Sequence, residues 1–445
     1  MYYNRDFMKK IAYFVISLLF AIILQHDVFA QNVRALSLSD AITIAKQNNS
    51  DYLIAKLDKD KADRKVSEVY SENLLPTITL NTKYIRNFKL QVISIFGQTF
   101  ALGNDNSVTN TVDVSEPIPI LGTPVFSGIR IAEYYSKLQE ENVSKVETQI
   151  KADVKKAFLN VLLLKEVIEL NKQSIDNANE NLRVVEARYR AGVALEYDYI
   201  RAKVKAETLV PDLQKSENNL EVAKKFLKNT IGLKDREDID VKGVLTYDSS
   251  EVWGTMDNLI YKISERNVAI RQLSLSRLIN DELVRVDEAN YMPKIYLFGE
   301  WGIQANEDDG RNFFKYRYYN AYLAGVGLTW DLNLFSNTYK KQQSVIEVKK
   351  TEEQIRDVKE KLKTQTESVF LNIEEAKSRI VAQSKIVDEA ERGLELATAS
   401  FKSGALNQID VIDAELAVSQ VKLAYIQAIY DYLNARTDLE QLLEK

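Results

Sequence analysis

The chain has 445 residues, a formal net charge of −5 and no cysteine, and its one histidine is His26. Without cysteine it can form no disulfide, no zinc–thiolate site and no cysteine-linked lipid anchor, and one histidine near the N-terminus leaves little for general-base or transition-metal chemistry. The mild negative charge argues against nucleic acid as a partner. We therefore expect no enzyme, no cofactor and no metal site.

Residues 1–30 have the pattern of a secretory signal peptide. Three basic residues precede an apolar run over about 11–24, and Val28-Phe29-Ala30 has the small-residue spacing of a cleavage site. An uncleaved anchor is the alternative, but the run is short for a membrane span. We expect an exported protein. No later run of about twenty apolar residues predicts a transmembrane helix.

Four later segments alternate apolar and polar residues with the two-residue period of a β-strand. They form two pairs, each around a polar loop, at about 77–84 with 108–114 and at 294–304 with 322–331. A half-buried sheet of a soluble domain would show the same alternation. Lengths near ten residues and aromatic-rich ends favour a membrane barrel. These aromatic residues are Tyr316, Tyr318, Tyr319, Tyr322, Trp301 and Trp330.

Four strands in one chain are too few to close a barrel, and an open sheet edge cannot face lipid. Several copies must then share one barrel. Two copies would give about eight strands with a filled interior, whereas three would give about twelve strands around a water-filled lumen.

Two stretches of more than 60 residues, 129–191 and 328–392, contain neither proline nor glycine. Each predicts a helix on the order of 90–100 Å long, and return helices are expected at about 195–230 and 406–443. A heptad repeat of apolar residues predicts that each out-and-back pair is an antiparallel coiled coil. The positions at seven-residue spacing are Val154, Val161, Ile168, Ile175, Leu182 and Tyr189 in the first helix and Ile373, Ile380, Val387, Leu394 and Phe401 in the second.

The second half repeats the first with an offset of 212 residues, and even the polar interruption of the heptads recurs, as Asn171 and Gln383. We interpret this as duplication of a structural unit. The expected domains are a first repeat at 31–232 and a second at 254–445, each with a helix, a strand pair and a long helical hairpin. Residues 233–253 would link them.

The two helix reversals match best. Gly192 and Gly404 are expected to supply the positive φ of a tight turn. After the second turn, Asp410 and Asp413 are three residues apart and therefore share one face of the return helix, and Asp198 is the counterpart of Asp410 in the first tip. The simpler interpretation is that these are ordinary acids favoured at a helix N-terminus.

These features resemble the TolC-type outer-membrane efflux proteins over about 36–443. The resemblance rests on the two tips, each Gly followed six residues later by Asp, and on Leu75-Pro76-x-Ile78-x-Leu80, which recurs as Met292-Pro293-x-Ile295-x-Leu297 at strand entry.

The resemblance implies an α+β membrane protein of Gram-negative bacteria. It would be a homotrimer with a twelve-stranded β-barrel in the outer membrane, four strands per chain, an equatorial region and a long periplasmic α-helical barrel. Such a protein is a passive exit duct for drugs, other small molecules or type I secreted proteins. Its partners would be a periplasmic adaptor, an inner-membrane pump and outer-membrane lipid.

By the same resemblance, Asp410 and Asp413 match the acidic rings of the periplasmic constriction, and Asp198 belongs to the same gate. Tyr189 and Phe401 take the place of residues that make tip contacts. Leu406 stands where the best-known relative has a basic latch residue, so that closing bond is not expected here. The missing N-terminal cysteine leaves the barrel as the membrane attachment.

Three alternatives stay open at this stage. A periplasmic coiled-coil scaffold or adaptor would explain the helices but not the strands. A hydrolase of the cell envelope is disfavoured by the lack of cysteine and histidine beyond the leader. Asp308 and Asp309 could ligate calcium, but a solvated surface loop is the simpler explanation.

Overall fold

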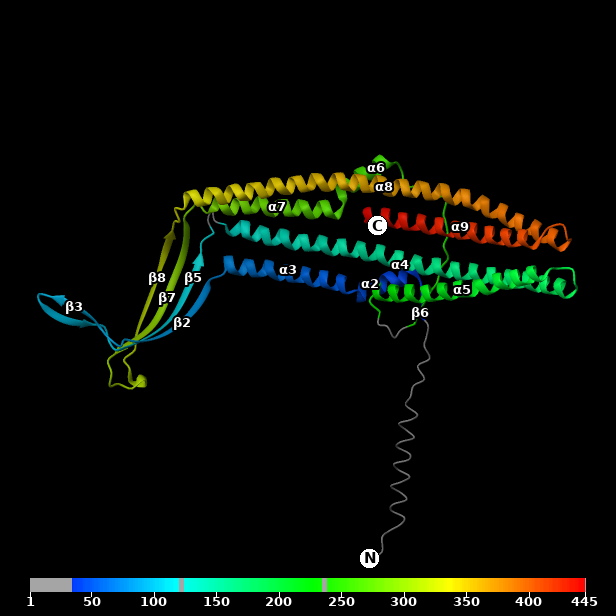
Figure 1. Cartoon of the computed structure of the whole chain (residues 1–445). Coiled ribbons are helices and arrows are strands. Elements are labelled where there is room, and N and C mark those ends of the chain that lie inside the picture. Colours follow the sequence, from blue (N-terminus) through cyan, green and yellow to red (C-terminus); the bar gives the residue numbers. More distant parts are fainter. Residues whose placement is uncertain (1–33, 120–123, 234–237, 445) are drawn as a thin grey trace, which may run out of the picture. The chain divides into compact units, whose positions relative to one another are not determined.

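The structure is a computed structural model that describes residues 34–119, 124–233 and 238–444 (Figure 1). The expected leader at 1–30 lies outside the described residues. By their contacts, the residues divide into two compact units, which are described separately. The first unit comprises the residues up to Asn49, Ile150–Ser249 and Glu374–Thr437, and the second comprises Ser50–Gln149, Ser250–Ile373 and the residues from Asp438.

The first unit is built from long helices. It contains α2 (Leu38–Asn48), α5 (Glu196–Thr230), α9 (Gln408–Leu442) up to Thr437, α4 (Val125–Arg190) from Ile150 onward, and the last part of α8 (Leu334–Lys402). The predicted long helices are confirmed, and the two return helices, α5 and α9, begin and end within two residues of the expected bounds. A parallel pair, β1 (Arg34–Leu36) and β6 (Ile239–Val241), was not predicted, because three-residue strands are too short for a periodic pattern.

The predicted seam lies in the interior of these helices. Val154 and Val161 are fully buried, Ile380 is 2% exposed, and the other predicted heptad positions are buried or half-buried except Tyr189, which is 38% exposed. The polar interruption is also satisfied, because Asn171 donates from Nδ2 to Ser216 Oγ on α5 over 2.9 Å. The predicted apolar stripes therefore lie inside the helical unit, and at the tips helices of both hairpins bury them.

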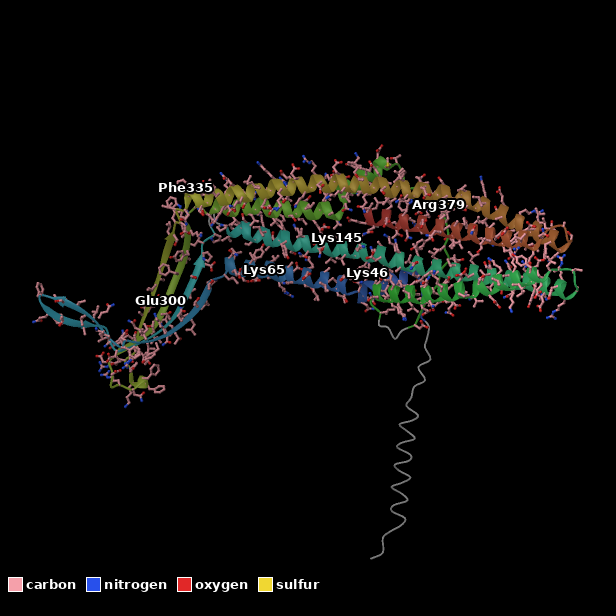
Figure 2. The ribbon with its side chains drawn as sticks, viewed as in Figure 1. Lys46, Lys65, Lys145, Glu300, Phe335 and Arg379 are labelled. Atoms are coloured by element: carbon pink, nitrogen blue, oxygen red, sulfur yellow. The ribbon has the colours of Figure 1, made fainter. Side chains whose placement is uncertain are left out.

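The second unit pairs shorter helices with the first parts of α4 and α8. Ser136 of α4 donates to Asp63 of α3 (Ser50–Leu74) over 2.6 Å, and Asn280 of α7 (Val268–Ala289) donates to Thr351 over 2.9 Å. The unit also contains α6 (Met256–Arg266). The outer faces of these helices carry exposed lysines such as Lys65 and Lys145 (Figure 2). Throughout the described ranges, no helix has both the length and the apolar character needed to cross a membrane.

The four predicted strands are confirmed and form one antiparallel sheet in the second unit, in the order β2-β5-β7-β8. Their bounds are β2 (Thr77–Arg86), β5 (Asn106–Pro117), β7 (Lys294–Glu307) and β8 (Tyr319–Thr329). Within the described part of the chain, β2 and β8 each have one neighbour, so each leaves one edge unpaired.

The prediction of a polar loop between the first two strands was wrong. Residues 91–102 form a separate hairpin of β3 (Gln91–Ile95) and β4 (Gln98–Leu102). Phe96 and Gly97 make its two-residue turn, with φ values of +53° and +82°. Positive φ at both turn residues matches the right-handed twist of two adjacent strands, and this turn chemistry was overlooked because Phe96 is not a usual turn residue.

Candidate functional site

The sheet separates its side chains into an apolar and a polar face. The register aligns Leu80 with Val112, Val112 with Trp301 and Trp301 with Tyr322, so one row of apolar side chains crosses all four strands. Because strand side chains alternate, Ile78, Ile303 and Val326 fall on the same face. In the single chain, Leu80 is 72% and Tyr322 85% exposed. Exposed apolar surface of this kind marks a lipid or protein contact.

The opposite face carries the charged and amide side chains, together with Tyr296, Phe298 and Leu323. Asn81 donates to Asp113 of the neighbouring strand over 2.7 Å, and Glu300 continues the row on β7 (Figure 2). On β8 this face carries Gly327, and a Cβ there would lie 2.3 Å from the Tyr296 ring. The Tyr296 ring therefore needs a glycine opposite it on β8. Taken as a whole, the sheet has one face suited to water and one suited to hydrocarbon.

The two helix reversals have the expected geometry. Gly192 has φ +71° and Gly404 φ +83°, and the Gly192 amide donates to the Tyr189 carbonyl over 2.9 Å. No atom beyond the neighbouring residues would contact a Cβ at either glycine. The backbone conformation, rather than crowding, is thus the reason for glycine at these turns.

The two tips of one chain pack against each other. Phe401 of α8 shares a buried cluster with Val185 of α4, Ala202 of α5 and Val411 of α9, so all four helices contribute. Tyr189 stacks on Tyr199 with ring centres 5.5 Å apart. The structure thus places the two predicted contact residues, Tyr189 and Phe401, in one tip region.

Arg188 also joins the tips, and sequence reasoning missed it. Its Nη1 donates to the Phe401 carbonyl over 3.1 Å, and its guanidinium carbon lies 4.7 Å from the centre of the Phe401 ring. This combines a hydrogen bond with a cation–π contact. A basic residue in the last turn of α4 was the available signal, but its acceptor is a backbone oxygen of the other repeat.

The predicted acids lie at the starts of the return helices. Asp410 accepts a hydrogen bond from the Asn407 amide over 3.0 Å, as an acid in the first turn of a helix often does. Asp410 and Asp413 are both exposed, and Asp198 is half-buried in the first turn of α5. Leu406 is 40% exposed. The bonding of Asp410 matches the helix-start interpretation and leaves its carboxylate at the surface.

A cavity of about 150 Å³ lies beside the tip cluster, between α4, α8 and α9. Its lining includes Glu180, Asn181, Phe401 and Glu415. Burial raises the pKa of the Glu415 carboxyl, and the charge of Lys205 opposes this rise. Sequence reasoning did not single out Glu415, because its burial depends on the packing of three helices.

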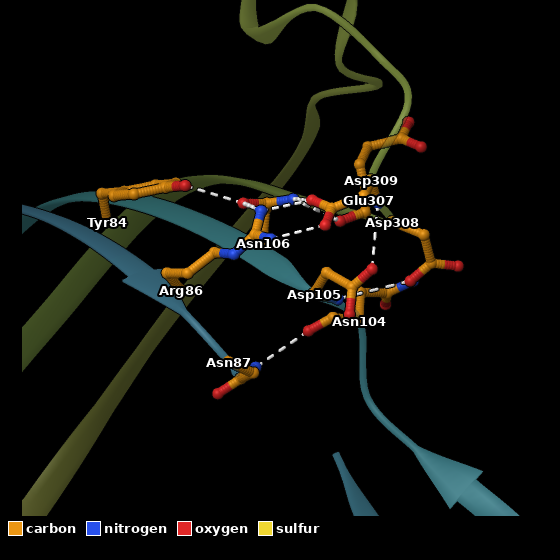
Figure 3. A network of polar contacts seen from close by, with 9 residues as sticks. All are labelled: Tyr84, Arg86, Asn87, Asn104, Asp105, Asn106, Glu307, Asp308 and Asp309. Carbon is orange, nitrogen blue, oxygen red and sulfur yellow. Dashed lines mark hydrogen bonds and ion pairs between the residues drawn. The ribbon is translucent and has the colours of Figure 1, made fainter. Parts of the chain in front are cut away.

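Asp308 and Asp309 fasten two strand-connecting loops together (Figure 3). Asp309 forms an ion pair with Arg86 and accepts from Asn106 Nδ2 over 3.1 Å. Asp308 accepts from Asn104 Nδ2 over 3.1 Å. In the described ranges, no cluster of three or more histidine, cysteine or acidic residues is arranged to hold a metal ion. Both acids accept hydrogen bonds from residues in or beside the connection between β2 and β5.

Comparison with known proteins agrees with this architecture. The sequence model of the outer membrane efflux protein family matches residues 41–232 and 259–444. The chain belongs to this family. Its members are outer-membrane proteins of Gram-negative bacteria that extend into the periplasm, and the chain shares this location. They are channel and efflux proteins rather than enzymes, which supports an efflux role here.

Individual family members are distant in sequence and alike in fold. The outer membrane protein TolC of Escherichia coli is 21% identical over 93% of this chain and 83% of its own length. The cobalt-zinc-cadmium resistance protein CzcC of Cupriavidus metallidurans is 23% identical over 75% of this chain and 77% of its own length. The structure of the outer membrane protein VceC from Vibrio cholerae covers 92% of this chain and 96% of its own, with a TM-score of 0.75 and 15% identity.

Proposed function

We propose that three copies of this chain form one passive exit duct through the outer membrane, with a twelve-stranded barrel continued by a periplasmic helical barrel. The main support is the sheet, whose apolar face and two open edges are unsatisfied in one chain. Sheet edges must be paired in lipid, and three four-stranded sheets close a barrel wide enough for a water-filled lumen. The polar face with Asn81 and Glu300 would line that lumen.

The helices also leave surface for neighbouring copies. Ile409, Leu416 and Leu423 are spaced seven residues apart on α9 and are 36%, 43% and 43% exposed. Such a stripe is typical of a coiled-coil seam that lacks its partner. In the trimer, six hairpins would wall the periplasmic tube. The repeats at 31–232 and 254–445 would each supply a strand pair and a hairpin, joined by the equatorial linker at 233–253.

The helical tips would form the gate. Threefold repetition of Asp410 and Asp413 would place six carboxylates near the axis, with Asp198 as their counterpart on the first hairpin. Gly192 and Gly404 would act as rigid turns. Like charges repel, so closure depends on contacts such as the Arg188–Phe401 pair, which holds the two tips of one chain together.

Transport energy would come from partners. The family and the fold are those of outer-membrane efflux channels, so we infer a duct that works with a periplasmic adaptor and an inner-membrane pump. Relatives are named for metal resistance and for pyoverdine export. We accordingly propose efflux of small toxic compounds, with type I protein secretion as the second possibility for the same duct.

The assembly can be tested by native mass spectrometry of the protein extracted in detergent. We expect the mass of three chains and a requirement for detergent during extraction. A stable monomer or dimer, or recovery in the soluble periplasmic fraction as for a scaffold or adaptor, would exclude the trimeric duct.

The gate can be tested in planar bilayers by replacing Asp410 and Asp413 with alanine together. The native protein should conduct little, prefer cations and be blocked by trivalent cations from the periplasmic side. The double variant should lose the block and much of the selectivity. A matched control replaces Asp388 and Glu389, two exposed acids of α8, with alanine. If the tip variant behaves like this control, the tip acids only start the helix.

A further inference from the structure

The loop between β2 and β5 carries an apolar hairpin that the duct itself does not require. Strands β3 and β4 pair with each other and, in the described part of the chain, with no other strand. Their register places Ile93, Ile95, Phe100 and Leu102 on one face, each at least 39% exposed, together with Gln91 and Gln98, and the other face carries Val92, Ser94, Thr99 and Ala101. An isolated two-stranded hairpin is only marginally stable in water, so we expect another surface to cover this apolar face.

The turn of this hairpin points to the kind of partner. Phe96 has a left-handed backbone, with φ +53°, and its side chain is fully exposed. Asparagine or glycine is favoured at such a position, and a bulky aromatic residue is strained there. The aromatic ring at the tip is therefore not explained by turn formation and suggests a contact made by the ring itself.

This loop differs from its counterpart in the second repeat in the number and sign of its charged residues. From Phe88 to Gly103 the one charged residue is the exposed Lys89, and there is no carboxylate. The counterpart loop at 308–318 carries two acids and three basic residues. An apolar face with a lysine and no acid complements an anionic lipid surface, where carboxylates would be repelled.

We propose that this hairpin lies in the outer leaflet of the membrane beside the barrel. Its apolar face meets acyl chains, Phe96 inserts as a wedge, and Lys89 stays among anionic headgroups. The inference rests on the proposed function, because periplasmic helices put this loop at the cell-surface ends of the strands. The hairpins of three copies could instead cover one another over the pore, but that arrangement gives Phe96 and Lys89 no role.

Hydrogen bonds hold the base of the hairpin in place beside the sheet. The Asn87 amide donates to the Asp105 carbonyl and its Nδ2 to the Asn104 carbonyl, both over 2.8 Å. Asp308 and Asp309 then tie the same segment to the counterpart loop (Figure 3). These contacts fix the segments before and after the hairpin, so the point at which the hairpin leaves the sheet is well defined.

The test uses the natural lack of cysteine. Full-length Ile95→Cys and Ser94→Cys variants place a fluorophore on opposite faces of the hairpin at adjacent residues. The protein is reconstituted into vesicles of phosphatidylcholine and phosphatidylglycerol. Quenching is then measured with lipids brominated in the acyl chains and with aqueous iodide. A Val326→Cys variant reports the apolar face of the main sheet, which the barrel places in lipid.

We expect bromolipid to quench the label at position 95 severalfold more than that at 94, and iodide to show the reverse order. Adding Lys89→Glu should weaken lipid quenching at 95 in anionic vesicles and leave it unchanged in pure phosphatidylcholine. Equal iodide quenching at 94 and 95 overturns the proposal, as does protection of 95 from both quenchers, which would indicate contact between copies. If bromolipid quenches neither the label at 95 nor the label at 326, the proposed barrel is rejected. If it quenches the label at 326 but not the label at 95, only the hairpin inference is rejected.

Discussion

The helical hairpins and the strand sheet satisfy their apolar residues in different ways. In the hairpins, Val161 and Ile380 are almost completely buried by helices of the same chain. In the sheet, Leu80 and Tyr322 remain largely exposed, and both outer strands lack a second neighbour within the described residues. One region can therefore complete its core alone, while the other depends on lipid and further copies. Four substitutions would break or sharpen this contrast.

The largest effect is expected in the buried seam. Val161→Asp places an unpaired charge in a fully buried position and should destabilise the hairpin by about 3–5 kcal/mol, with loss of assembled protein. Thermal unfolding followed by circular dichroism measures this. The exposed Gln173→Asp on the same helix should stay within about 0.5 kcal/mol of the native protein. Equal melting of the two variants would mean that the heptad positions are not the seam.

The sheet should show a face-dependent effect. Leu80→Arg puts a charge on the apolar face and should cost about 2–4 kcal/mol if that face meets the bilayer centre. Thr79→Arg, one residue earlier and on the polar face, should be tolerated, because it faces water. The two variants are compared by measuring the fraction of each protein that stays folded in vesicles as the urea concentration rises. If Leu80→Arg were as stable as Thr79→Arg, both faces would be hydrated and the sheet would belong to a soluble domain.

A smaller effect is expected at the tips. Arg188→Ala removes the hydrogen bond to the Phe401 carbonyl and the contact with its ring, which together contribute about 1–2 kcal/mol. We expect a higher resting conductance in planar bilayers, since the two hairpins of a chain separate more easily. Arg190→Ala loses only an exposed ion pair with Glu186 and serves as the control. Identical conductance of both variants would remove Arg188 from the closed state.

The smallest effect concerns Glu415 and pH. Burial raises the pKa of this carboxyl in the folded tip above its ordinary value of 4.5. The folded state then binds its proton more tightly than the unfolded state, so its stabilising contribution is complete below the unfolded pKa and is lost as pH rises through the folded pKa. Glu415→Gln should flatten this loss and raise the melting temperature slightly at neutral pH. Glu389→Gln on the exposed face of α8 is the control, and an unchanged pH profile in Glu415→Gln would contradict the assignment.

Much of the fold could be predicted because its signals are local and periodic. The helix from Val125 to Arg190 follows from a long segment almost free of helix breakers, and the four main strands follow from two-residue alternation. The turns at Gly192 and Gly404 follow from the duplicated spacing. The β3–β4 hairpin was missed because its turn residue, Phe96, gives no turn signal.

The sequence by itself determined the long helices, the four main strands, the apolar seam positions and the family resemblance, because each depends on residues near one another in the chain. Only the tertiary structure showed that Arg188 reaches the Phe401 carbonyl and that Glu415 lines a cavity. It also decided that Asp308 and Asp309 bind neighbouring loops. These contacts join residues of different elements, most of them some 200 positions apart, where no periodic pattern constrains the pairing and packing alone selects the partner.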